Sequence, residues 1–186
     1  MRATRKLPPG QMGELRLLLE ELCCDLLQFR LAGTPGLDMR SVRIDREVHL
    51  GIAGGFADVR VTAPGQNPAF IEIKHGLRDT LVLERIRRKY SVETPVSSGP
   101  GRLVLVVDTA HRSGWDHLEA EIVRSLRPGL ELEVWNEERL FAQLAGEFDV
   151  RPTALDVEQL LEVRQAIERV KGHRAFSDGP LDGYEN

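Results

Sequence analysis

One stretch, residues 55–74, constrains the fold more than any other part of the chain. It contains two short segments in which apolar and polar residues alternate, and a run rich in turn-forming residues separates them. Because successive side chains of a strand point to opposite faces, each segment has one apolar face suited to burial under a helix. The stretch therefore predicts a β-hairpin that closes around Gly65.

The polar face of this hairpin carries Asp58 on its first strand and Glu72 and Lys74 on its second. In such a hairpin Asp58 lies opposite or diagonal to Glu72, and directly opposed residues have Cβ atoms about 4.5–5.5 Å apart. Two carboxylates this close repel each other unless a cation compensates their charge. Mg²⁺ binds through one or two carboxylates and keeps waters or phosphate oxygens as further ligands. The pattern thus predicts a divalent metal site with the Lys74 ammonium beside it.

An Asp followed at hairpin distance by Glu-x-Lys resembles the PD-(D/E)xK motif of the restriction-endonuclease-like nuclease superfamily. The motif stands here as Asp58 and Glu72-Ile73-Lys74, with Ala57 in place of the proline. The resemblance implies that Asp58, Glu72 and the Ile73 carbonyl bind Mg²⁺ or Mn²⁺. It also implies that Lys74 positions or activates the attacking water, so the catalytic residues would be Asp58, Glu72 and Lys74.

A plainer interpretation exists for Glu72 and Lys74, because charged residues make up 29% of the chain and Glu-x-Lys arises easily by chance. The two residues would then be ordinary charges on a solvated strand face. The position of Asp58 and the apolar partner face of the hairpin favour the metal site.

A basic helix is predicted directly after the hairpin, over residues 80–91. Lysine and arginine side chains on such a helix can neutralise the phosphates of a nucleic acid. We expect Arg85, Arg88 and Lys89 to bind nucleic acid, with DNA favoured over RNA, and the resembled family commonly uses this helix in that way. A solvated basic face explains the same residues. The net charge of −4 does not itself indicate a nucleic-acid-binding protein.

The first helix, predicted over residues 11–30, has an apolar stripe at three- and four-residue spacing. Acidic residues lie along one edge of the stripe. In the resembled family the first helix often lends an acid to the metal site, which makes Glu14 or Glu21 a candidate, although solvated acids on a helix face are commoner.

The order of predicted elements is helix, three strands, helix, strand, helix, strand and helix. Connections through helices favour an α/β fold with a mixed central sheet flanked by helices. The first six elements follow the αβββαβ core of the restriction-endonuclease-like superfamily over about residues 11–110, with extra C-terminal helices. The expected organisation comprises a flexible arm (1–10), a nuclease-like domain (11–150), a C-terminal helix (151–171) that packs on the core or dimerises, and a disordered tail (172–186).

The expected function is metal-dependent hydrolysis of phosphodiester bonds in nucleic acid. The alternative is a catalytically inactive nuclease-fold module for nucleic-acid binding or protein assembly, and a homodimer or a larger effector complex is compatible with either. No apolar run approaches the roughly 18 residues of a membrane span. The basic N-terminus lacks the apolar segment of a secretory signal. We therefore expect a cytoplasmic protein that does not contact membranes.

Overall fold

The computed structural model describes residues 9–32, 34, 37, 39–50, 55–74, 79–91, 100–107 and 115–177. Its helices and strands are α1 Pro9–Ala32, η1 Met39–Ser41, β1 Arg43–His49, β2 Phe56–Thr62, β3 Ala69–Lys74, α2 Asp79–Tyr90, β4 Gly101–Val107, α3 Trp115–Ser125, β5 Leu130–Trp135, α4 Glu137–Phe148 and α5 Val157–Ser177.

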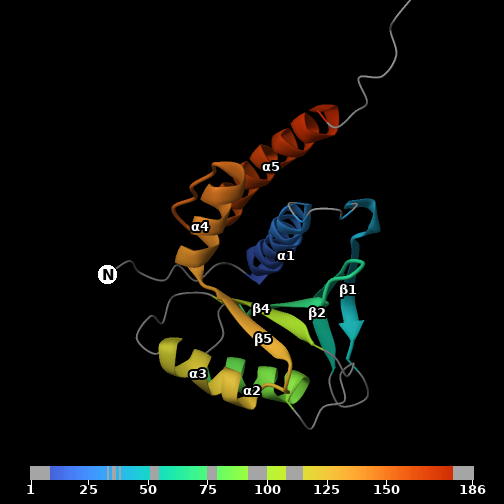
Figure 1. The fold of residues 1–186 in the computed structure, drawn as a ribbon. Coiled ribbons are helices and arrows are strands. Elements are labelled where there is room, and N and C mark those ends of the chain that lie inside the picture. Colours follow the sequence, from blue (N-terminus) through green and yellow to red (C-terminus); the bar gives the residue numbers. More distant parts are fainter. Residues whose placement is uncertain are drawn as a thin grey trace, which may run out of the picture.

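The strands form one sheet in the order β1-β2-β3-β4-β5. The β1–β2 and β2–β3 pairs are antiparallel, whereas the β3–β4 and β4–β5 pairs are parallel. Parallel neighbours need a crossover, and α2 and α3 lie in the two crossovers. Figure 1 shows α2 and α3 on one face of the sheet and α1, α4 and α5 on the other. The predicted α/β class with a mixed, helix-flanked sheet is confirmed.

Each face of the sheet has its own apolar layer. The layer under α1, α4 and α5 takes Val104 and Val106 from β4. The layer over α2 and α3 takes Leu103 and Leu105 from the same strand. An uninterrupted apolar run is typical of a strand buried on both faces, which is why β4 could be predicted from its sequence.

Strand β2 changes faces at Asp58. The alternating pattern predicts that Ala57, Val59 and Val61 share one face, and this is wrong for Ala57. Val59 and Val61 lie in the α1 layer, whereas Ala57 lies in the α2 layer. The change falls where β2 stops pairing with β3, because their ladder extends only over Val59–Val61 on β2.

A backbone distortion lies on the neighbouring strand at the same level. Glu47 has φ 49°, a left-handed conformation that costs a non-glycine residue on the order of 1–3 kcal/mol. The register of β1 and β2 is the same on both sides of Glu47, so no residue is inserted. Strand β1 therefore has no bulge at Glu47.

Helix α5 packs on the core. Leu160, Val163 and Ile167 are buried in the same layer as α1. The ion pair between Lys171 and Asp25 on α1 adds a polar contact, with 2.5 Å between Nζ and Oδ1. The helix continues to Ser177 rather than ending at residue 171, and the rest of the predicted tail and residues 1–8 of the predicted arm lie outside the described residues.

In the part of the chain that the structure describes, none of the helices is both long and apolar enough to cross a membrane.

Candidate functional site

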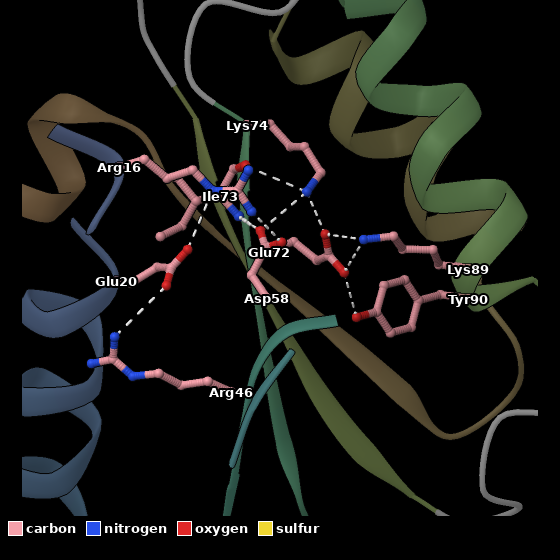
Figure 2. A network of polar contacts seen from close by, with 9 residues as sticks. All are labelled: Arg16, Glu20, Arg46, Asp58, Glu72, Ile73, Lys74, Lys89 and Tyr90. Carbon is pink, nitrogen blue, oxygen red and sulfur yellow. Dashed lines mark hydrogen bonds and ion pairs between the residues drawn. The ribbon is translucent and has the colours of Figure 1, made fainter. Parts of the chain in front are cut away.

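The residues of the predicted motif come together where β2 and β3 separate (Figure 2). The last pair of the β2–β3 ladder toward the site is Val59 with Ile71, and Asp58 and Glu72 are the residues directly beyond it. Lys74 follows two residues later on β3. Its Nζ lies 3.3 Å from Asp58 Oδ2 and donates a hydrogen bond to Glu72 Oε2.

These three side chains are buried. Their exposed fractions are 9% for Asp58, 0% for Glu72 and 5% for Lys74. The interpretation of Glu72 and Lys74 as charges on a solvated strand face is therefore wrong. Burying an ion costs several kcal/mol unless charged partners and hydrogen bonds compensate. The buried charges of Asp58, Glu72 and Lys74 therefore need one another as partners, and their ion pairs fix the positions of the three side chains.

The Lys74 ammonium lies at the meeting point of the three groups that the motif resemblance assigns as metal ligands. Besides the two carboxylates, it lies 3.4 Å from the backbone carbonyl oxygen of Ile73. A cation thus already occupies the position on which these oxygens converge. Two carboxylates and one carbonyl are ligands that suit Mg²⁺ and Mn²⁺, with water or phosphate completing the coordination. The residues present fit such an ion, provided that Lys74 moves aside.

No three side chains of His, Cys, Asp or Glu within the described residues are grouped so that they alone could hold a metal. A divalent ion at this position would therefore depend on backbone, water and substrate oxygens as well as on Asp58 and Glu72.

Asp58 is held from two sides. The backbone N–H of Ile73 donates to Oδ2 at 2.7 Å, and Arg16 of α1 donates from Nη2 to Oδ1 at 2.7 Å. Arg16 also donates from Nε to Glu20 Oε1 at 3.2 Å. Burial raises the pKa of Glu20, and the negative charge of Asp58 adds to this, against the opposing effect of Arg16.

Glu20 is thus the acid of α1 beside the site, joined to Asp58 through Arg16. The sequence pattern favours Glu14 or Glu21, and this prediction is wrong. Glu14 is exposed, and Glu21 pairs with Arg164 of α5 at 2.9 Å. The spacing of Arg16 and Glu20, four residues apart on one helix face, was a usable signal. The spacing alone, however, does not show which edge of the helix faces β2.

Glu72 is held by two adjacent residues at the end of α2. Lys89 Nζ lies 2.8 Å from each carboxylate oxygen, and the Tyr90 hydroxyl donates to Oε1 at 2.8 Å. Burial raises the pKa of Tyr90 well above its usual value, and the charge of Glu72 raises it further, so the phenol stays protonated. Lys89 points into the site and is 8% exposed, whereas Arg85 and Arg88 are exposed.

The charges of the site are balanced by the protein itself. The ammonium groups of Lys74 and Lys89 and the guanidinium of Arg16 pair with Asp58 and Glu72. A divalent cation is therefore not needed to relieve the repulsion of the two acids, contrary to the argument from sequence. A metal at the point where the candidate ligand oxygens converge would have to displace Lys74 and compete with Arg16 for Asp58.

Comparison with known proteins adds no assignment: no family model matches the chain, and no curated protein matches it. A functional proposal therefore depends on the geometry and chemistry of this site.

Proposed function

We propose that this protein is a Mg²⁺- or Mn²⁺-dependent nuclease with a restriction-endonuclease-like core, which hydrolyses phosphodiester bonds, with DNA favoured over RNA as substrate. One observation carries the proposal. The Lys74 ammonium lies among the carboxylates of Asp58 and Glu72 and the carbonyl of Ile73, the donor set that the motif resemblance assigns to a divalent ion. The order of elements from α1 to β4 also follows the αβββαβ core.

The roles of the residues follow from their chemistry. Asp58, Glu72 and the Ile73 carbonyl would hold the divalent ion, which supplies polarisation of the phosphate and a more acidic water. Lys74, released from the carboxylates, would donate hydrogen bonds to the attacking water or to a phosphate oxygen. A positioned cation of this kind stabilises the negative charge that develops on the phosphate.

Substrate binding would involve the exposed face of α2. Arg85 and Arg88 are exposed on the same helix that carries Lys89 and Tyr90 into the site. Their guanidinium groups would neutralise backbone phosphates, so binding is expected to weaken as salt rises.

The test is cleavage of plasmid DNA, linear DNA and RNA by the full chain with Mg²⁺, Mn²⁺ or EDTA. We expect cleavage that requires the metal and that falls by at least about 100-fold in Asp58→Ala and in Lys74→Ala. Asp45→Ala is the matched control, because Asp45 is an acid on the adjacent strand β1 whose partners, Arg43 and Arg60, lie outside the site. Cleavage that survives either site substitution at the wild-type rate contradicts the proposal.

A second function is favoured by the charge balance of the site. Because side-chain cations already pair with both acids, the same residues could serve as a structural network in a catalytically inactive module for nucleic-acid binding or protein assembly. Calorimetry separates the two functions. Retained nucleic-acid binding without detectable Mn²⁺ binding favours the inactive module.

A further inference from the structure

The two oxygens of Glu72 have different surroundings. Oε1 accepts hydrogen bonds from the Tyr90 hydroxyl and from Lys89, both at 2.8 Å. Oε2 accepts from Lys89 at 2.8 Å and from Lys74, which also reaches Asp58. Figure 2 shows Glu72 between α2 on one side and Lys74 on the other. Lys89 thus ties both oxygens to the helix, and Tyr90 adds a second donor to Oε1. Oε2 instead shares the ammonium of Lys74 with Asp58.

The two donors from α2 are held firmly. Tyr90 is fully buried, and its ring packs against Phe70 with 5.9 Å between ring centroids. Lys89 is buried beside it and places its ammonium between both oxygens of Glu72. Because a buried ammonium is costly without a charged partner, Lys89 and Glu72 stabilise each other's position.

The different partners of Oε1 and Oε2 matter in the proposed reaction, in which Lys74 leaves the carboxylates and donates to the attacking water or to the phosphate. Glu72 then loses one donor and one positive charge on Oε2. Lys89 still supplies a counter-charge, and Tyr90 still fixes Oε1, so the carboxylate keeps its orientation toward Asp58. A side chain that binds a metal through one atom is oriented by the groups that hydrogen-bond to its other atoms.

We propose that Lys89 and Tyr90 are positioning residues, which hold Glu72 so that its Oε2 faces Asp58 and is available to a divalent cation. This inference rests on the proposed nuclease function. It assigns Lys89 to the support of the metal ligand and removes it from the residues that contact nucleic acid.

The experiment compares Lys89→Met, Lys89→Arg and Tyr90→Phe with the wild-type full chain. Mn²⁺ binding is measured by calorimetry, and DNA binding is measured by fluorescence anisotropy in EDTA over a series of salt concentrations. We expect Lys89→Met to weaken Mn²⁺ binding on the order of 10- to 100-fold, with DNA affinity and its salt dependence unchanged. Lys89→Arg should recover part of the Mn²⁺ affinity, because it keeps the charge. In cleavage assays kcat should fall and KM should stay constant.

Arg85→Met is the matched control. Arg85 is a cation on the same helix, but it is exposed. This substitution should weaken DNA binding and lower the slope of the salt dependence by about 1, while leaving Mn²⁺ affinity unchanged.

The opposite pattern in Lys89→Met overturns the inference: wild-type Mn²⁺ affinity together with weaker, less salt-sensitive DNA binding identifies Lys89 as a phosphate-binding residue. If circular dichroism shows that Lys89→Met does not fold, the Mn²⁺ affinities of Tyr90→Phe and Lys89→Arg test the inference instead. Weaker Mn²⁺ binding in Tyr90→Phe supports the inference, and unchanged Mn²⁺ affinity in both variants overturns it. Failure of the proposed function gives a different result, because the wild-type chain itself then binds no Mn²⁺.

Discussion

The backbone N–H of Ile73 donates a 2.7 Å hydrogen bond to the carboxylate of Asp58. The ladder between β2 and β3 has ended by this point, since its last pair toward the site is Val59 with Ile71. The Asp58 side chain therefore satisfies a buried backbone donor that a neighbouring strand would otherwise pair. This contact links the acid of β2 to the Glu72-Ile73-Lys74 segment of β3, so the sheet's geometry sets the geometry of the site.

The balance of buried charge predicts a large stability effect at Glu72. In Glu72→Gln the ammonium groups of Lys74 and Lys89 lose a buried counter-charge. Breaking a buried pair from one side typically costs about 3–5 kcal/mol, and we expect a loss of unfolding free energy in that range. Urea denaturation followed by circular dichroism measures it.

The double variant Glu72→Gln/Lys89→Met completes this measurement. Because it removes one of the stranded ammonium groups, its destabilisation should be smaller than the sum of the two single effects. Additive effects would show that Lys89 and Glu72 are not coupled in solution. Asp45→Asn, which alters an acid outside the site, serves as the control.

A pH dependence of stability is predicted at Glu133. Burial alone would raise the pKa of Glu133, but hydrogen bonds from Trp135 and Arg30 and the charges of Arg30 and Arg102 lower it below the ordinary 4.5. A lowered folded-state pKa contributes stability that is present above the unfolded pKa and is lost as pH falls through the folded value.

The measurement is the difference in unfolding free energy between the wild type and Glu133→Gln. It should be about 1 kcal/mol near pH 7, a modest value because the ion pairs are partly exposed and screened by solvent. It should decrease as pH falls below about 4.5. A difference that stays constant or grows between pH 7 and pH 4 contradicts the assignment.

Helix α5 is predicted to contribute to the stability of the core. Ile167 is fully buried in the layer that contains α1, whereas Leu161 on the same helix is 40% exposed. Ile167→Ala should lower the unfolding free energy by about 2–5 kcal/mol, and Leu161→Ala should have a much smaller effect. Equal effects of the two substitutions in urea denaturation would mean that α5 does not pack on the core as described.

Much of the fold could be predicted from sequence because the relevant signals are local. The continuous apolar run that ends at Val107 predicts a strand buried on both faces, and β4 is such a strand. The alternation around the turn at Gly65 predicts the register of β2 and β3, which brings Asp58 and Glu72 to the same end of the ladder. The residues of the motif could therefore be placed together before their surroundings were known.

The surroundings depend on tertiary packing, which local patterns do not specify. The inward direction of Lys89 follows from the rotation of α2 about its axis, although its position three residues after buried Ile86 was a usable hint. The change of face at Ala57 depends on where β2 leaves β3. The role of Arg16 depends on which edge of α1 lies against β2. Arg16 and Lys89 supply the positive charges that balance Asp58 and Glu72, so the need for a metal cannot be judged from the local sequence alone.

Arg16 is predicted to compete with a divalent ion for the carboxylate of Asp58. Its guanidinium donates to Asp58 Oδ1 at 2.7 Å, but its side chain is 53% exposed, so the pair is worth on the order of 1 kcal/mol or less. Arg16→Leu should therefore strengthen Mn²⁺ binding by up to about fivefold in calorimetry, which is the factor that 1 kcal/mol represents. Arg139→Leu, which alters an arginine that pairs with Glu119 away from the site, should leave it unchanged. Weaker Mn²⁺ binding in Arg16→Leu would mean instead that Arg16 holds Asp58 in the orientation that the metal requires.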